Sequence, residues 1–242
     1  MDTQDGLMLS LAPTAGRPLL GVTILLVEDS RFAAEGLRQM CVRSGARIRR
    51  ADSLASARKH LRVYRPTIVL VDMTLPDGSG SQLILEMAGS LPRIEAILAI
   101  SGDPGARDPA LAAGADGFLV KPVARLSTFQ SLILAHLPKE RQPLGPRPLS
   151  DERIAPDLVA YRDDLNHAAH LLEPGRRPAD VDYLTQFLGG VARSAGDTAL
   201  GEAVMALAAS GATGVPPQGA IDVVAALVRS RIAAPADFLG SL

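Results

Sequence analysis

Short apolar runs rich in β-branched residues alternate with helically periodic segments from residue 22 to residue 137. This alternation is typical of a parallel sheet with helices on both faces. The runs predict strands at Val22–Val27, Arg47–Arg50, Thr67–Val71, Ala96–Ile100 and Phe118–Val120. The periodic segments predict helices at Phe32–Arg43, Leu54–Val63, Ser81–Ala88, Asp108–Ala113 and Leu126–Leu137. Five βα units of this size indicate an α/β fold with a doubly wound five-stranded parallel sheet.

The pattern changes after this region. Residues 138–150 contain four prolines and a glycine, which indicates a linker. Beyond it apolar residues such as Ile154 recur at helical spacing, which predicts helices at about 151–172, 179–195, 198–209 and 218–233. Pro156 is expected to delay the start of the first of these helices. An all-α antiparallel helical bundle is the natural packing of such helices. The expected organisation is an N-terminal extension at 1–21, an α/β domain at 22–137, the linker, and a helical domain at 151–242.

Cysteine usage and hydropathy limit the location of the protein. Cys41 is the only cysteine, so a disulfide framework and a zinc site with several cysteines are excluded, and we expect Cys41 to be a small buried apolar residue. Residues 1–21 lack the pattern of a signal peptide, and no run of about eighteen apolar residues predicts a membrane span. We therefore expect a cytoplasmic protein with no membrane partner.

Charge is divided unequally along the chain. Residues 1–150 carry 18 basic and 14 acidic side chains, whereas residues 151–242 carry 7 basic and 12 acidic ones. Contacts to a nucleic-acid backbone require clustered positive charge. The helical domain lacks it, so nucleic acid is an unfavoured partner.

Polar residues follow four of the predicted strands. Glu28 and Asp29 follow the first strand, Asp72 the third, Ser101 the fourth and Lys121 the fifth. The carboxyl ends of parallel strands lie at one edge of a sheet, so we expect these side chains to meet there. Three converging carboxylates repel each other unless a cation lies between them, and oxygen ligands suit Mg²⁺. The sequence predicts a magnesium site.

A carboxylate held beside a metal ion can attack a phosphoryl donor. Asp72 is the central candidate for this nucleophile. Lys121 can pair with the phosphoryl oxygens, and the Ser101 hydroxyl can donate a hydrogen bond to one of them. These residues predict a site for an acyl phosphate.

Four segments resemble the receiver domains of bacterial two-component response regulators. They are residues 24–30 (ILLVEDS), 69–80 (VLVDMTLPDGSG), 100–102 (ISG) and 114–122 (GADGFLVKP), in the order and spacing of that family. The resemblance covers about half of the chain. It implies that Asp72 accepts phosphate from a histidine kinase or a phosphotransfer protein. It also implies a phosphoacceptor rather than an enzyme, with hydrolysis limited to its own phosphate.

The resemblance also implies roles for individual residues. Mg²⁺ would be held by Glu28, Asp29, Asp72 and the main-chain carbonyl of Thr74. Phosphorylation would draw the Ser101 hydroxyl inward and let Phe118 repack, which reshapes the face made by the fourth helix, fifth strand and fifth helix. The bond between Lys121 and Pro122 is expected to be cis.

Two features depart from the family pattern. Glu28 stands where many members have Asp, which lengthens the arm toward the metal by one methylene. The segment Gly102–Pro109 is rich in Gly and Pro, so the fourth helix is expected to be short.

The function of the helical domain stays open between three hypotheses. In the first, which we favour, it acts by protein contact, either as a homodimer interface or by docking a kinase. In the second, it is a helix-turn-helix of a transcriptional regulator, which the acidic balance disfavours. In the third, it is enzymatic or relays phosphate through His167 or His170, but the His-x-x-Lys-Gly pattern of phosphotransfer domains is absent and residues 151–242 contain no Lys. We interpret both histidines as solvated or interfacial.

Other residues of this domain have structural interpretations. Asp163 and Asp164 are expected to be surface charges. Residues of the next helix are expected to form the bundle core, namely Tyr183, Phe187, Leu188 and Val191.

Overall fold

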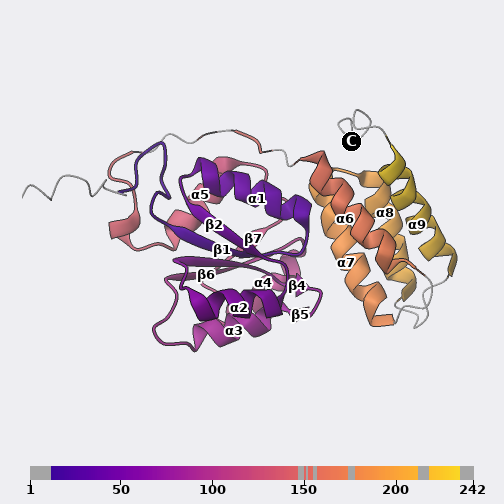
Figure 1. Cartoon of the computed structure of the whole chain (residues 1–242), viewed down its shortest axis with the longest axis horizontal. Helices are drawn as coiled ribbons and strands as arrows, with labels where there is room; N and C mark the ends of the chain where they lie inside the picture. Colours follow the sequence, from indigo (N-terminus) through magenta and orange to yellow (C-terminus); the bar gives the residue numbers. More distant parts are fainter. Residues whose placement is uncertain are drawn as a thin grey trace, which may run out of the picture.

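The molecule consists of an α/β domain and a helical bundle that lies against one end of it (Figure 1). The structure is a computed structural model that describes residues 12–146, 150, 152–154, 157–173, 178–211 and 218–234. The predicted N-terminal extension is therefore described from residue 12 onward. Within it, Leu19 is fully buried in the core of the α/β domain.

Five parallel strands form the sheet of the α/β domain, in the order β2-β1-β3-β6-β7. They are β1 (Thr23–Val27), β2 (Arg47–Ala51), β3 (Ile68–Asp72), β6 (Ala96–Ser101) and β7 (Gly117–Val120). Strands β3 and β6 are buried along their whole length, as expected for central strands covered on both faces. The predicted doubly wound sheet is confirmed. A short antiparallel hairpin of β4 (Thr74–Leu75) and β5 (Gly78–Ser79) was not predicted.

Helices cover both faces of this sheet. Their bounds are α1 (Arg31–Arg43), α2 (Leu54–Val63), α3 (Gly80–Ala88), α4 (Arg107–Ala112) and α5 (Leu126–Ala135). Apolar residues of α1 and α5, such as Met40 and Phe129, pack in one core cluster. Residues of α2, α3 and α4, such as Leu54, Ile84 and Ala110, pack in a second cluster on the other face. The two clusters fix the sheet and thereby the edge where the predicted site lies.

The chain that leaves the α/β domain returns to it before the helical bundle begins. After a short 3-10 turn at Lys139–Arg141, Ile154 donates its amide to the Ala124 carbonyl at 3.0 Å, and its side chain is buried in the α/β core. Helix α6 therefore begins at Leu158, with the Asp157 side chain as its cap. The helix predicted at about 151–172 thus starts later than residue 151, in agreement with the delay expected from Pro156, and Ile154 packs on the sheet instead of in the bundle.

Four helices form the bundle: α6 (Leu158–Leu171), α7 (Pro178–Ala195), α8 (Thr198–Gly211) and α9 (Gln218–Ala233). The last three match their predicted ranges closely. Buried apolar side chains from all four helices form one core cluster. At its edge, buried Asp197 accepts hydrogen bonds from the Tyr161 hydroxyl and the Arg231 guanidinium, both at 2.8 Å. This cluster also contains Phe32 of α1, which belongs to the other domain.

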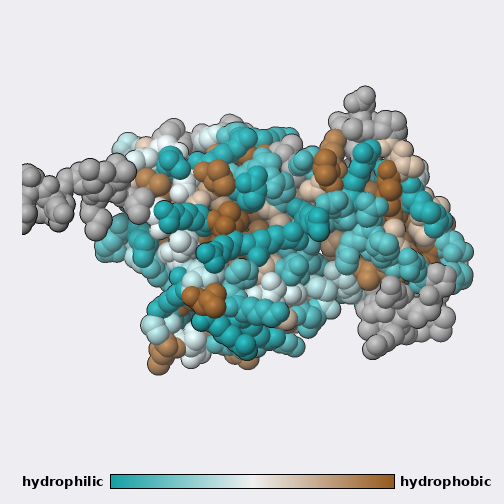
Figure 2. Space-filling model, viewed as in Figure 1, coloured by the Kyte–Doolittle hydropathy of each residue, from teal (hydrophilic) through white to brown (hydrophobic). Residues whose placement is uncertain are grey.

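The face shown in Figure 2 is mostly hydrophilic, with small and separated apolar patches. Cys41 is buried, as predicted. In the part of the chain that the structure describes, no helix combines the length and the apolar character needed to cross a membrane.

Candidate functional site: an acidic pocket at the carboxyl edge of the sheet

The ends of strands β1 and β3 bring three carboxylates together. Strands β1 and β3 are neighbours in the sheet, so Glu28 and Asp29 after β1 lie beside Asp72 at the end of β3. One oxygen atom from each of these side chains lies within 4.8 Å of the other two. Glu28 is fully buried and Asp72 is 6% exposed. The structure thus places these three predicted residues in one acidic pocket.

Lys121 joins two of these carboxylates. Its Nζ lies 2.6 Å from Glu28 Oε2 and 2.7 Å from Asp72 Oδ2. Lys121 reaches them from the end of β7, on the far side of β6. Burial works against the ammonium charge, but the neighbouring carboxylates of Asp72 and Glu28 raise the pKa of Lys121 above its ordinary value.

Burial and mutual repulsion make the ionised carboxylates of this pocket less stable. Burial raises the pKa of Glu28 well above its ordinary value, and the charge of Asp72 adds to the effect. Burial and the charge of Asp72 also raise the pKa of Asp29 to about 6. A raised carboxyl pKa means that the ionised form lacks compensating positive charge. The pocket therefore favours a further cation.

Backbone groups hold the carboxylates in place. The Ser30 amide donates to Asp29 Oδ1 at 2.9 Å and to Glu28 Oε1 at 3.2 Å, and the Thr74 amide donates to Asp72 Oδ1 at 3.3 Å. The loop after β3 needs a glycine, because a Cβ atom on Gly80 would lie 2.1 Å from the Asp72 carbonyl oxygen.

Of two further predicted residues, Ser101 lies at this pocket and Phe118 lies within β7. Ser101 is 5% exposed, lines the same cavity as the carboxylates, and accepts a hydrogen bond on its Oγ from the Asp103 amide at 3.1 Å. Phe118 pairs with Ala99 in the sheet and is partly buried against the cluster of α2, α3 and α4. The bond between Lys121 and Pro122 is cis, as predicted. The fourth helix, α4, is short, and a 3-10 turn at Pro104–Ala106 precedes it.

The donor set fits Mg²⁺. It consists of carboxylate oxygens only, and the three carboxylates exceed the single ammonium group in charge. Hard oxygen ligands and excess negative charge are what Mg²⁺ requires. Glu28, Asp29 and Asp72 are the residues that would hold the ion. Thr74 lines the same cavity, and the metal-binding role of its carbonyl stays a prediction.

The helical domain reaches into this pocket, which the sequence did not predict. The Tyr183 hydroxyl of α7 donates to Asp29 Oδ2 at 2.6 Å. Three residues further along α7, the Gln186 side chain accepts a hydrogen bond from the Thr74 hydroxyl at 2.9 Å. Tyr183 was expected in the bundle core. Its ring does stack on Phe187 there, with centroids 5.8 Å apart, but its hydroxyl extends to the acidic pocket.

Asp164 is a second residue whose role was missed. It was expected to be a surface charge, but it is 2% exposed and accepts hydrogen bonds from Ser30 Oγ at 2.7 Å, the Arg31 amide at 2.8 Å and the Phe32 amide at 3.0 Å. The expectation was wrong because α1 presents free amides at its first turn, which a carboxylate from α6 can satisfy. Its position beside Leu165, on the apolar face of α6, was the available signal.

A cavity of about 260 Å³ lies between the two domains. The acidic pocket forms one wall, and α7 forms the opposite wall. The α7 wall includes two glycines, Gly189 and Gly190, and the side chain of Arg193. Arg193 lies against the loop after β6, because a Cβ atom on Gly102 would meet its guanidinium.

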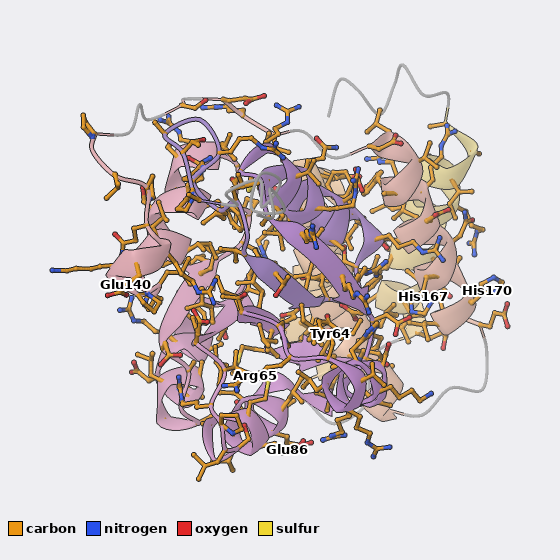
Figure 3. All side chains as sticks on the ribbon, turned by 60° about the vertical axis from the view of Figure 1, so that its left-hand side comes forward. Tyr64, Arg65, Glu86, Glu140, His167 and His170 are labelled. Atoms are coloured by element: carbon orange, nitrogen blue, oxygen red, sulfur yellow. The ribbon has the colours of Figure 1, made fainter. Side chains whose placement is uncertain are left out.

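The two histidines of α6 lie elsewhere. His167 packs edge-on against Phe187 at 5.4 Å, and burial lowers its pKa. The His170 side chain is 76% exposed and lies 3.3 Å from Glu173, pointing away from the α/β domain (Figure 3). Neither residue is among those that line the cavity next to Asp72 in the described part of the chain. This placement agrees with their interpretation as solvated or interfacial.

Known proteins resemble the α/β domain. Residues 24–132 match the family model of the response regulator receiver domain. The chain is 27% identical over 128 residues to the KDP operon transcriptional regulatory protein KdpE of Escherichia coli. This alignment covers 52% of this chain and 56% of that protein. It is 38% identical over 108 residues to the transcriptional regulatory protein CitB of Klebsiella pneumoniae. That alignment covers 42% of this chain and 45% of that protein.

A solved structure is also similar. The receiver domain of a sensor histidine kinase from Pseudomonas aeruginosa, described with a magnesium ion in its active site cleft, is 25% identical. The match covers 48% of this chain and 96% of that chain, with a TM-score of 0.44.

These matches differ in how much of each molecule they cover. The chain spans about half the length of the curated relatives that it matches. The family match ends within α5, so it does not extend to the helical bundle. Residues 24–132 of this chain belong to the response regulator receiver domain family.

Proposed function

We propose that this protein is a two-component response regulator that accepts a phosphoryl group on Asp72 from a histidine kinase or a phosphotransfer protein. The observation that carries the proposal is the position of Lys121, whose ammonium group joins Asp72 and Glu28 next to Asp29. A carboxylate nucleophile beside a fixed cation is the arrangement that phosphoryl transfer requires. The family match of residues 24–132 supports the same function.

The transfer balances as a simple displacement. An oxygen of Asp72 attacks the phosphorus, the bond from phosphorus to the donor nitrogen breaks, and that nitrogen takes up a proton. When bound, Mg²⁺ would neutralise charge on the transferring phosphoryl group. Lys121 would pair with a phosphoryl oxygen once Asp72 is phosphorylated, and the Ser101 hydroxyl would donate to another.

The remaining assignments follow from this function. The protein acts as a phosphoacceptor whose only hydrolytic activity is on its own acyl phosphate. Ser101 and Phe118 would report the phosphorylated state. We place the protein in the cytoplasm, where its single buried cysteine stays reduced.

We propose that the helical domain acts by protein contact. Its 12 acidic and 7 basic side chains disfavour contacts with a nucleic-acid backbone. Its four helices share one apolar core with Phe32 of α1, so the bundle packs on a protein surface, that of the α/β domain. The relatives named as transcriptional regulators match over about half of their length.

Incubation of the purified chain with Mg²⁺ and acetyl phosphate tests the proposal. We expect a mass increase of one phosphoryl group that hydroxylamine removes, as it does for an acyl phosphate. The Asp72→Asn variant should show no increase. Asp52→Asn is the matched control, because Asp52 is an exposed aspartate that follows β2 at the same edge of the sheet. Labelling that persists in Asp72→Asn, or that is lost in Asp52→Asn, contradicts the proposal.

A further inference from the structure

Helix α7 covers the acidic pocket. Residues of α7 face Glu28, Asp29 and Asp72 across the cavity between the domains. The contacts that hold α6 and α7 on the receiver domain include two polar bonds, from Tyr183 to Asp29 and between Gln186 and Thr74, beside the apolar packing of Phe32 on the bundle core. Figure 1 shows α6 and α7 as the two bundle helices next to α1 and β4.

Every carboxylate oxygen of the acidic pocket has a partner in this arrangement. Lys121 takes one oxygen of Glu28 and one of Asp72. Main-chain amides of Ser30 and Thr74 take one oxygen of each of the three carboxylates. The last oxygen, Asp29 Oδ2, is taken by the Tyr183 hydroxyl. The helical domain thus completes the set of partners in a pocket that is otherwise built by the receiver domain.

We propose that α7 is a reversible cover of the phosphoacceptor pocket, held by Tyr183, and that Mg²⁺ at Asp29 and docking of α7 compete. This inference rests on the proposed function, because it concerns regulation of the same site. The partner that the α6 and α7 surface fits is the chain's own receiver domain. A protein phosphodonor then reaches Asp72 only after α7 has moved.

The competition follows from the geometry of a magnesium site. Mg²⁺ binds carboxylate oxygens at about 2.0–2.1 Å in octahedral geometry and keeps several water ligands. Asp29 Oδ2 already has the Tyr183 oxygen at 2.6 Å, on the side of the pocket that α7 faces. A metal ion held by Asp29 would withdraw charge from the bond to Tyr183, and any water ligand that it kept on this side would compete with α7 for space.

The size of the cavity indicates that a protein phosphodonor cannot reach Asp72 while α7 is docked. A volume of about 260 Å³ is below the range of about 300–1,000 Å³ that is usual for small-molecule sites. It cannot admit a histidine together with the helix that carries it. The cover must therefore open for phosphotransfer from a protein, whereas free Mg²⁺ is small enough to compete directly with Tyr183.

Some of the contacts that hold the cover are exposed to solvent and therefore weak. The ion pair between Arg31 and Asp163 is formed by side chains that are 62% and 40% exposed, so it contributes little. The hydrogen bond between Thr74 and Gln186 is exposed to solvent. The stronger contacts are those of Tyr183 and Asp164, and only the Tyr183 bond is made to a predicted metal ligand.

Calorimetric titration of the full chain with Mg²⁺ tests the competition. Tyr183→Phe keeps the ring that stacks on Phe187 and removes the hydroxyl that binds Asp29. We expect this variant to bind Mg²⁺ roughly tenfold more tightly than the unaltered chain, since a hydrogen bond to a charged acceptor is lost from the competing state. Tyr64→Phe is the matched control, because Tyr64 ends α2 at the opposite edge of the sheet and its buried hydroxyl has no hydrogen-bond partner in the described structure. Its affinity should equal that of the unaltered chain.

Hydrogen exchange reports the cover itself, without phosphorylation. The amides of Arg31 and Phe32 donate to Asp164, so their protection depends on the docked helical domain. We expect Mg²⁺ to accelerate exchange at these two amides and along α7. Unchanged protection at saturating Mg²⁺ overturns the proposal, as does a Tyr183→Phe variant with unaltered Mg²⁺ affinity.

A locked variant tests the opposite direction. Arg31→Cys together with Asp163→Cys places two thiols at an existing contact, and buried Cys41 is protected from reagent. Bridging these thiols with a reducible reagent should weaken Mg²⁺ binding and slow labelling by acetyl phosphate, and reduction should restore both. Equal Mg²⁺ affinity of the bridged and reduced forms overturns the competition.

The outcomes separate this inference from the proposed function. A chain that shows the Mg²⁺ effects but is never labelled on Asp72 refutes the proposed function and retains the competition. A chain that is labelled on Asp72 but shows no Mg²⁺ effect of Tyr183→Phe refutes the competition alone. A chain that binds no Mg²⁺ in any variant refutes the competition and the magnesium assignment.

Discussion

Two adjacent aspartates of α6, Asp163 and Asp164, offer a direct test of how the helical domain is held. Both bind the start of α1. Asp163 pairs with the Arg31 guanidinium at 2.7 Å on the surface, whereas Asp164 is buried and accepts three hydrogen bonds. We predict that Asp164→Ala strongly weakens docking and that Asp163→Ala has little effect.

The magnitude follows from the three bonds of Asp164. Hydrogen bonds to a charged acceptor contribute about 1.5–3 kcal/mol each, which gives a gross value of about 5–9 kcal/mol. The cost of burying the carboxylate offsets part of this, and the same burial raises the pKa of Asp164. Loss of a cap at a helix start costs about 0.5–2 kcal/mol. Between these limits we expect about 2–4 kcal/mol for Asp164→Ala. For the exposed pair of Asp163 we expect below about 1 kcal/mol.

Hydrogen exchange at the first turn of α1 measures the difference. A loss of about 3 kcal/mol corresponds to an increase of about two orders of magnitude in the opening equilibrium of the Arg31 and Phe32 amides. Asp163→Ala should change it less than about fivefold. Equal effects of the two substitutions, or a larger effect of Asp163→Ala, would refute the reasoning that burial decides which contact holds the domains together.

Two further predictions concern pH and the bundle. Because the pKa of Asp29 is raised to about 6 and the pKa of Glu28 is also raised, protons compete with Mg²⁺ for these ligands, so Mg²⁺ affinity measured by titration should fall by about tenfold or more per pH unit below about pH 6. A flat profile would contradict this. Asp197→Asn should lower the stability of the helical domain by about 3 kcal/mol, because it leaves the Arg231 guanidinium without its buried counter-charge. Circular dichroism should show this loss as a lower melting temperature. An unchanged melting temperature would show that the ion pair is dispensable.

The sequence predicted the receiver domain well because its signals are local. Apolar runs identify buried strands, and the residues that follow them identify one edge of a parallel sheet. Glu28, Asp29 and Asp72 could therefore be placed together without any knowledge of side-chain contacts. The hairpin of β4 and β5 was missed, because strands of two residues are too short to show a period.

The contacts between the domains could not be predicted in this way. Tyr183 and Asp29 are 154 residues apart, and Asp164 and Ser30 are 134 apart. Periodicity identifies the apolar face of a helix but not the surface on which that face packs. The burial of Asp164 could have been predicted, because a carboxylate on the apolar face of a helix needs hydrogen-bond donors from another element. Ile154 shows the converse, since its apolar side chain was assigned to the bundle and packs on the sheet.

Ser30 connects the pocket to the helical domain by a short path. Its amide donates to Asp29 and Glu28, and its hydroxyl caps α1 at the Ala33 amide and donates to Asp164. A shift of the Asp29 loop therefore alters the contacts of α6 directly, through a single residue. The face made by α4, β7 and α5 is not needed for this connection, which suits a chain whose α4 has only six residues. The geometry thus connects the acidic pocket to the helical domain at the start of α1, where Phe32 packs on Tyr161 with ring centroids 5.6 Å apart.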